Sequence, residues 1–459
     1  MLTAKRRRRI LLLVIVQILN GGTEMVRVLL LICLVCASVS AQTRDNLSGP
    51  PSSPLSGPWI LTELFSTETH THRMSLDVMG EKISGQSGNS KIDGSIINGV
   101  VTLKWLAPDG RVEATYTGKL NDGVLKGDGD WDGLKLQWNA RRPATRSERS
   151  PKTHTFVPTE FHRTFSYAIP PALRIFPGDT VKTKSVDAGG TDENSVKRSM
   201  GGNPLTGPFF VEGAVPGDTL VIKLIRVRTN RDWAGSGQSV VGNALGPGYL
   251  MNLKRAQNFS SRWKIDAARG IAYLDKPTEP LKRFTVPLAP MLGCIGVAPP
   301  GRNSVQTGDS GIFGGNMDYN QIREGTTVYL PVFQDGALLF MGDGHAAQGD
   351  GELTGDALET SMEFEFTVDV ISDKSIGTPR AENNEYIMAI GIGGSLDQAL
   401  QRATTEMARW LEGDYKLNST ESAMVLGFAI KYEVADLVGT QVSVVAKIPK
   451  TALAQLKQQ

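Results

Sequence analysis

The segment Met362-Glu-Phe-Glu-Phe-Thr-Val-Asp-Val370 alternates apolar side chains with polar or charged ones. Successive side chains of a β-strand point to opposite faces, so this alternation predicts a strand with one face in a core. Two upstream runs also suit half-buried strands, Val221-Ile-Lys-Leu-Ile-Arg-Val-Arg228 and Thr327-Val-Tyr-Leu-Pro-Val-Phe333. We therefore expect the chain from 154 to about 371 to be built mainly of strands.

The preceding region, residues 57–142, also has a strong β signature. Its short alternating segments include Trp59-Ile-Leu-Thr-Glu-Leu64, Gly99-Val-Val-Thr-Leu-Lys-Trp105 and Leu134-Lys-Leu-Gln-Trp138, separated by Gly, Asp and Asn. Closely spaced short strands with such turns predict a small antiparallel barrel or sandwich. Polar segments at 42–56 and 143–153 are expected to be linkers on either side of it.

Helices are expected only near the C-terminus. Apolar residues recur at three- and four-residue steps from Leu396 to Leu411, with Ser395 as a suitable N-cap. A second helix is predicted over Ser419–Tyr432, and a terminal helical turn over Thr451–Lys457. The predicted fold class is thus mainly β with a few helices.

The first 41 residues are typical of an export signal. A short charged region at Met25–Arg27 is followed by an apolar core, and Val39-Ser-Ala41 is a plausible cleavage site. We therefore expect a periplasmic or secreted protein; a retained membrane anchor is the alternative. Whether Met1 or Met25 is the true start stays open.

Removing this signal changes the composition. It takes away Cys33 and Cys36, which leaves Cys294 and no internal disulfide. The remaining chain has 43 Lys and Arg against 46 Asp and Glu, without a basic stripe. Nucleic-acid binding is therefore not expected.

The segment Met341-Gly-Asp-Gly-His-Ala-Ala-Gln-Gly-Asp-Gly-Glu352 is the strongest candidate for chemistry. It carries Asp343, His345, Asp350 and Glu352 among four glycines. Carboxylates this dense repel one another unless a cation, a proton or solvent intervenes. A metal site, a carboxylate of raised pKa and a solvated acidic turn are the alternatives that composition allows.

Three other features have simpler interpretations. Gly308-Asp-Ser-Gly311 resembles a serine-protease signature but lacks its neighbouring motifs. Cys294 lies among apolar residues and glycines, which favours a buried small side chain over a nucleophile. His70 and His72 have a spacing that can bind a metal, although two surface histidines are the simpler interpretation.

Several motifs, taken in order, resemble the acetamidase/formamidase family. They are Pro177-Gly-Asp-Thr-Val181, Asn203-Pro-Leu-Thr-Gly-Pro-Phe-Phe-Val-Glu212, Pro290-Met-Leu-Gly-Cys-Ile-Gly-Val-Ala-Pro299, Gly314-Gly-Asn-Met-Asp318 and Gly342–Glu352. The resemblance extends from about His154 to Pro449 and defines a catalytic domain at 154–459. It implies a β-sandwich core, a small primary amide as substrate, and hydrolysis to carboxylate and ammonia. A homodimer is also expected from the resemblance.

The resemblance further implies roles for individual residues. A divalent metal, zinc in preference to calcium or magnesium, would activate water, and a glutamate would act as general base. Glu352, Glu359 and Asp343 are the catalytic candidates, and which glutamate is the base stays open. The metal candidates are His345, Asp318, Asp187 and Asp350, and the substrate-binding candidates are Asn316, Gly315, His162 and Glu212.

Two questions stay open at this point. A non-catalytic exported binding protein with the same sandwich and a structural metal loop is the alternative function. The substrate is not fixed by the sequence either, and Trp233, Phe313 and Tyr319 are the expected pocket walls. The role of the N-terminal β domain is likewise open.

Overall fold

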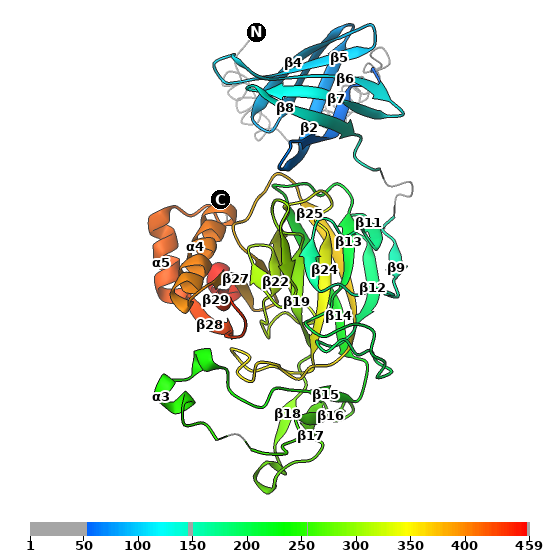
Figure 1. Ribbon diagram of the computed structural model, residues 1–459. Helices are drawn as coiled ribbons and strands as arrows, with labels where there is room; N and C mark the ends of the chain where they lie inside the picture. Colours follow the sequence, from blue (N-terminus) through cyan, green and yellow to red (C-terminus); the bar gives the residue numbers. More distant parts are fainter. Residues whose placement is uncertain (1–52, 146–149, 255, 457–459) are drawn as a thin grey trace, which may run out of the picture.

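The computed structural model describes residues 53–145, 150–254 and 256–456 (Figure 1). The predicted signal peptide, with Cys33 and Cys36, lies outside these residues, as does most of the predicted linker at 42–56. In the part of the chain that is described, no helix is long and apolar enough to cross a membrane.

The N-terminal module is a closed barrel in which each strand pairs with the next and β1 pairs with β8. Its strands are β1 (Gly57–Leu64), β2 (Thr69–Met79), β3 (Lys82–Ser87), β4 (Ser90–Ile97), β5 (Val100–Leu106), β6 (Val112–Asn121), β7 (Val124–Trp131) and β8 (Leu134–Arg141). Inward-facing Trp59, Trp105, Tyr116 and Trp138 fill it with aromatic rings. Of the two predicted forms, barrel or sandwich, the barrel is the one observed.

His70 and His72 lie at the barrel surface, next to one buried carboxylate. Both lie about 4 Å from the carboxylate of Glu63, which is buried inside the barrel and accepts a hydrogen bond from Tyr116. Burial raises the pKa of Glu63 and lowers that of His72 to about 4. His70 is exposed and His72 half-buried, as expected of surface histidines, and both lie over the buried Glu63 carboxylate.

The rest of the chain contains two large sheets. The six-stranded sheet has the order β11 (Leu173–Ile175), β13 (Thr206–Val211), β24 (Leu339–His345), β19 (Met291–Val297), β22 (Gly314–Asn316), β21 (Ser310–Gly311). The nine-stranded sheet has the order β28 (Lys431–Asp436), β29 (Val442–Pro449), β27 (Tyr386–Gly393), β26 (Arg380–Glu382), β23 (Thr327–Pro331), β14 (Thr219–Thr229), β25 (Met362–Ile371), β12 (Thr180–Ser185), β9 (Thr153–Thr155). A two-stranded sheet joins β10 (Thr164–Ser166) to β20 (Ser304–Gln306).

The two large sheets share one hydrophobic core. It contains Phe340 and Ile295 from the smaller sheet and Phe364, Phe366 and Leu224 from the larger. The segment Met362–Val370 is part of β25, and its alternate apolar residues point into this core, as the sequence predicted. The mainly β class with a sandwich core is confirmed.

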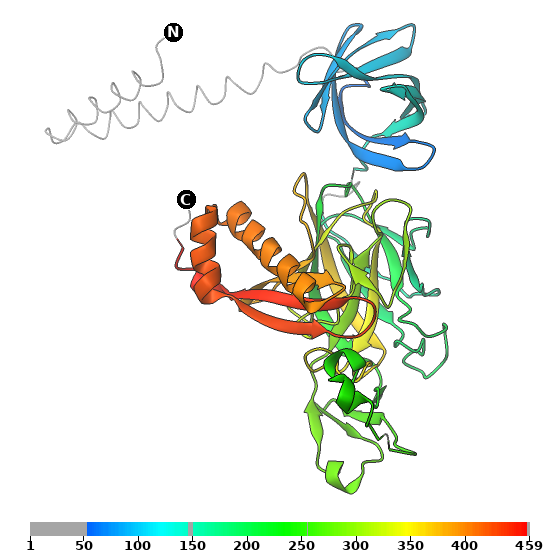
Figure 2. The same ribbon diagram turned by 60° about the vertical axis from the view of Figure 1, so that its left-hand side comes forward.

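The main helices lie on one side of the sandwich (Figures 1 and 2). They are α4 (Leu396–Asp414), α5 (Ser419–Ala429) and the short α6 (Lys450–Leu453). Ser395 caps α4 as predicted, by accepting a hydrogen bond from the backbone of Gln398. The second predicted helix ends three residues early, because β28 begins at Lys431 and pairs with β29.

Residues 233–287 form an arm at the far end of the molecule from the barrel (Figure 1). It contains a four-stranded sheet of β15 (Trp233–Gly235), β16 (Arg262–Asp266), β17 (Ile271–Leu274) and β18 (Thr285–Pro287). The short helices η1 (Gly242–Ala244), α3 (Pro247–Leu250) and η2 (Glu279–Leu281) lie in its connections. The sequence did not predict this arm as a separate element.

Two arginines of the barrel contact the sandwich. Arg141 donates to Asp335 at 2.7 Å, and Arg73 forms an ion pair with Asp218 at 2.5 Å. Arg73 also donates to the carbonyl oxygen of Gly213. The barrel is thus attached by specific polar contacts as well as by the chain.

Candidate active site

The end of β24 supplies the centre of the site. All seven residues of this strand are buried, and Asp343 and His345 point out of it into one space. Asp343 has φ of 57°, and Asp318 and Glu352 have φ of 40° and 46°. Backbone held in this sparsely populated region by a residue with a side chain is concentrated at functional sites.

Gly293, on the neighbouring strand β19, forms the floor of that space. Its neighbours Leu292 and Cys294 pair with Gly344 and Gly342, which places Gly293 opposite Asp343. A Cβ at this position would collide with the Asp318 carboxylate and approach the His345 ring to 2.9 Å. The close approach of these groups therefore requires glycine here.

Asp318 reaches the same space from the turn after β22. The backbone N–H groups of Met317 and Asp318 both donate to the carbonyl oxygen of Gly293, which fixes this turn. The Asn316 amide donates to Asp318 and accepts from Asn203, and Asn203 also donates to Asp343 at 2.9 Å. A chain of side-chain amides thus holds both aspartates in place.

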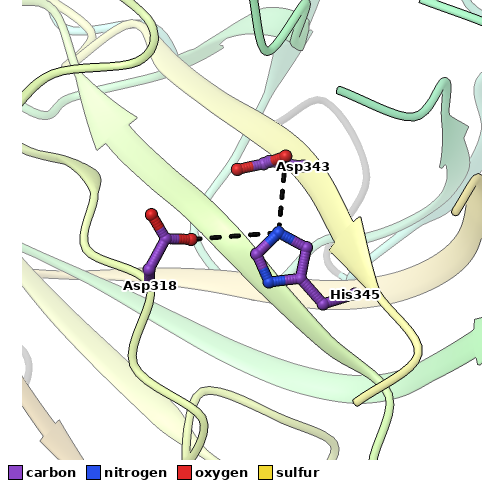
Figure 3. Close-up of side chains that lie close together, drawn as sticks. All are labelled: Asp318, Asp343 and His345. Atoms are coloured by element: carbon purple, nitrogen blue, oxygen red, sulfur yellow. Dashed lines mark ion pairs between the residues drawn. The ribbon is translucent and has the colours of Figure 1, made fainter. Parts of the chain in front are cut away.

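The two aspartate carboxylates converge on one ring nitrogen of His345 (Figure 3). His345 Nε2 lies 3.6 Å from Asp343 Oδ1 and 3.9 Å from Asp318 Oδ1. Its other nitrogen, Nδ1, lies 2.8 Å from Gln348 Oε1. The Gln348 amide nitrogen donates to the carbonyl oxygens of Asp318 and Ala435, so its oxygen is the atom that faces the ring.

Three further carboxylates complete the cluster. Glu359 Oε1 lies 3.1 Å from His345 Nε2. The backbone N–H of Ala357 donates to both Glu352 and Glu359 at 2.9 Å. Asp436 arrives from the end of β28, where Gly351 forms a parallel bridge with it. Its carboxylate groups with those of Asp318 and Glu352 within 4.8 Å.

The residues present fit a divalent cation. Asp318 Oδ1, Asp343 Oδ1, His345 Nε2 and Glu359 Oε2 are buried, and none has a hydrogen-bond partner among the described residues. Leaving buried polar atoms unpaired costs about 1–3 kcal/mol each, more when they are charged. Carboxylate oxygens and imidazole nitrogen are also the ligand types that zinc takes. A cation would satisfy several of these atoms together.

The electrostatics lead to the same conclusion. Burial, reinforced by neighbouring carboxylates, raises the pKa of Glu359 and Asp436 to about 8, and that of Glu352 to about 7. The pKa of Asp318 is also raised, for the same two reasons. Burial alone would lower the pKa of His345, but Glu359 and Asp343 outweigh it and raise that pKa. The metal-free cluster therefore retains protons that a cation would replace.

Five of the sequence candidates are thus brought together: Asp318, Asp343, His345, Glu352 and Glu359. Asn316 lies beside them, and Gly315 supports it in β22. The burial of Asp343, His345 and Glu352 rules out the solvated acidic turn that composition alone allowed.

Asp187 does not join the cluster. Its Oδ2 accepts from Arg231 at 2.6 Å, and both side chains are buried. Arg231 also donates to the Glu359 carbonyl oxygen and to Thr360. Asp187 thus pairs with a guanidinium group that supports the backbone of Glu359.

Three more candidates also lie apart from the cluster. Asp350 is exposed and accepts from Asn320. Glu212 follows the last residue of β13 and pairs with Arg174. That end of β13 lies beside the start of β24, whereas His345 lies at the end of β24. His162 forms a backbone bridge with Leu205 and packs its ring against Phe340. Burial, chiefly, lowers the pKa of His162.

The structure adds residues that sequence reasoning missed: Asp436, Gly293, Asn203, Gln348 and Arg231. Asp436 stands in the otherwise apolar run Val434-Ala-Asp-Leu-Val438. A carboxylate in such a run was the one local signal that could have revealed it. Cys294, by contrast, is fully buried as the simpler interpretation held, and burial raises the pKa of its thiol.

Comparisons with known proteins agree with this site. A model of the Acetamidase/Formamidase family matches residues 301–449, which include the cluster from Asp318 to Asp436. Over these residues the chain is similar to that family. The acetamidase of Mycolicibacterium smegmatis is 24% identical over 270 residues, covering 46% of this chain and 66% of the relative. The formamidase of Methylophilus methylotrophus is 24% identical over 267 residues, covering 47% of this chain and 65% of the relative.

Solved structures of the family share the fold. A predicted acetamidase/formamidase from the thermophile Thermoanaerobacter tengcongensis is 27% identical with a TM-score of 0.57, covering 68% of this chain and 100% of that one. An acetamidase from Bacillus halodurans is 28% identical with a TM-score of 0.56, covering 66% and 99%. The segments matched in the curated relatives span about two thirds of their length.

Proposed function

We propose that this chain hydrolyses a primary amide to a carboxylate and ammonia at the cluster around His345. The observation that carries the proposal is a set of four buried ligand atoms, on Asp318, Asp343, His345 and Glu359, that have no hydrogen-bond partner in the described part of the chain. They lie beside Glu352, a carboxylate of near-neutral pKa. Relatives described as acetamidase and formamidase support the reaction class.

Asp318, Asp343 and His345 are the proposed ligands of a divalent cation. One imidazole nitrogen with two carboxylate oxygens suits zinc, whereas calcium and magnesium prefer all-oxygen sets. Gln348 accepts a hydrogen bond from His345 Nδ1, which leaves the lone pair of Nε2 directed at the two aspartates. When bound, the cation supplies polarisation of the amide oxygen and acidification of water.

Glu352 is the proposed base. A pKa of about 7 suits a group that must accept and then return a proton near neutral pH. The Ala357 N–H holds Oε1 of Glu352, which fixes the carboxyl group beside His345. Glu352 takes a proton from the attacking water as the new C–O bond forms. It then gives that proton to the amide nitrogen as the C–N bond breaks, and ammonia leaves.

The test is ammonia release by purified protein from formamide, acetamide, propionamide and hexanamide, before and after chelation and after readdition of zinc. We expect turnover that chelator removes and zinc restores. His345→Ala is expected to lose metal and activity, while Asp350→Asn, an exposed acid of the same segment, retains both. A His345→Ala protein that is folded, metal-loaded and fully active would refute the proposed site. The absence of ammonia from every amide would refute the reaction.

We also propose that residues 1–41 direct export, on the basis of the charged and apolar regions before Ala41. N-terminal sequencing of protein recovered from the periplasm or medium should begin at Gln42. A homodimer is proposed from the family relationship, and light scattering of the purified protein tests it.

A further inference from the structure

A groove opens beside the cluster, between the arm and the segment 347–358. Its volume is about 610 Å³, and its apolar walls include Phe259, Trp263, Leu274, Phe284, Val286 and Leu358. None of the expected pocket residues lines it: Phe313 packs against Phe165 in the core, the Tyr319 hydroxyl donates to Glu433, and Trp233 stacks between Arg231 and Arg262. The groove thus replaces the pocket expected from the sequence.

The groove and the cluster share residues. Glu352 and Gln348 both line the groove, and Gln348 holds the ring of His345. Ala357, another lining residue, donates its N–H to both Glu352 and Glu359. A molecule lying in the groove therefore lies beside the proposed base.

The chemistry of the walls selects for an uncharged occupant. Among the described residues that line the groove, Glu352 is the one titratable side chain. Trp263 and Phe284 meet edge to face at 6.2 Å, and Phe284 retains 51% of its surface exposed. Covering exposed apolar surface with an apolar group removes it from water, which favours binding of that group.

The size of the groove favours a ligand larger than formamide or acetamide. Pockets of roughly 300–1,000 Å³ enclose ligands of drug-like size. Formamide and acetamide would leave most of these walls in contact with water. Each methylene that becomes buried contributes a factor of about four in binding.

From these observations we propose that the groove binds the acyl part of the substrate, so that the preferred amides carry large uncharged apolar acyl groups. This inference rests on the proposed amidase function and names its substrate class. The amide carbonyl lies at the Glu352 end, and the aliphatic or aromatic part extends toward Trp263 and Phe284.

The experiment compares kcat/KM for formamide, acetamide, hexanamide and phenylacetamide with the metal-loaded, full-length protein. Hexanamide has four more methylenes than acetamide, so we expect its kcat/KM to be roughly 50- to 250-fold higher. Phe284→Ala should lower the hexanamide-to-acetamide ratio by about tenfold. Leu353→Ala, a second substitution in the exposed part of the groove, should lower it by a smaller factor. Phe428→Ala, on the exposed face of α5, is the matched control and should not change the ratio.

The outcomes separate the two proposals. Ammonia from formamide and acetamide without a gain for longer amides would overturn the groove assignment and leave the amidase function standing. If no amide is hydrolysed, the function itself fails. If Phe284→Ala alters the oligomeric state but not the ratio, the groove is an interface between copies of the chain and the substrate assignment is wrong.

Discussion

His345 Nδ1 lies 2.8 Å from Gln348 Oε1, and this contact determines which ring nitrogen faces the carboxylates. The amide cannot turn over without losing its hydrogen bonds to the carbonyl oxygens of Asp318 and Ala435. Gln348 therefore acts through His345, as a positioning residue. Partners of this kind typically change metal affinity by about 10- to 100-fold.

Gln348→Leu should weaken metal binding by about that factor, because the imidazole loses the acceptor that fixes its tautomer. Competition with a chromogenic chelator measures the dissociation constant. Gln348→Glu keeps the acceptor oxygen and should recover part of the affinity, while Gln401→Leu on exposed α4 is the control. Unchanged affinity in Gln348→Leu would contradict the role.

Gly293→Ala should abolish metal binding, because the added methyl group occupies the space between Asp318, Asp343 and His345. Metal content per chain and ammonia release measure the effect, and circular dichroism checks the fold. Gly308→Ala is the matched control, since no atom lies within 4 Å of a Cβ there. A metal-loaded Gly293→Ala protein would mean that the ion binds elsewhere.

Glu352→Gln should lower kcat by about 10²- to 10⁴-fold while leaving the metal content unchanged, because it removes the proton acceptor and no proposed ligand. Glu359→Gln is the informative comparison, since Glu359 contacts His345 directly. If Glu359→Gln causes the larger loss in kcat and Glu352→Gln the smaller, the assignment of the base must be exchanged.

The metal-free protein should become less stable as pH rises from about 5 to 8. Glu352, Glu359 and Asp436 have folded-state pKa values of about 7, 8 and 8, above those of an unfolded chain near about 4. Their contribution to stability is complete below the unfolded values. It is lost as pH rises through the folded ones, because the folded state retains protons that the unfolded chain has released.

Thermal unfolding of chelator-treated protein across this range measures the effect. Zinc should raise the melting temperature most at pH 8, because the carboxylates have then lost most of their protons and repel one another unless a cation is bound. Glu359→Gln removes one of the titrating groups and should flatten the dependence. A metal-free protein whose melting temperature rises from pH 5 to pH 8 would contradict the prediction.

Arg231→Met should destabilise the fold by about 3–5 kcal/mol, because it leaves the buried Asp187 carboxylate without its partner. Arg228→Met is the control: Arg228 pairs with Glu324 at the surface, where such a pair contributes about 1 kcal/mol or less. Chemical denaturation compares the two. Equal losses of unfolding free energy in the two variants would show that the buried Arg231–Asp187 pair stabilises the fold no more than the surface pair does.

Local patterns predicted much of the fold, and the reason is visible in particular elements. The alternation in Met362–Val370 marks the one face of a strand that packs against a core. The three- to four-residue spacing after Ser395 marks the one buried face of a helix. The end of α5 could not be predicted this way, because pairing of β28 with β29 determines it. That pairing is a long-range contact that competes with local helix propensity.

The site divides in the same way. Asp343, His345 and Glu352 share one segment, so their density alone indicated chemistry. Asp436 reaches them only through a bridge to Gly351, 85 positions away in the chain. Asp187 and Asp350 have the residue type of ligands, but one is paired with an arginine and the other faces solvent. Residue type therefore identified candidates, and packing determined which of them meet.

The attachment of the barrel has a consequence for any attempt to divide this chain. Asp218 belongs to the sandwich and is completely buried, yet the cation that neutralises it, Arg73, belongs to β2 of the barrel. Cutting the chain at the connection after Arg141 would remove Arg73, and among the described residues the Asp218 carboxylate would then keep the backbone N–H groups of Val215 and Asp373 as its hydrogen-bond donors. The barrel and the sandwich are therefore separate in sequence but are joined by an ion pair whose acid is buried in the sandwich.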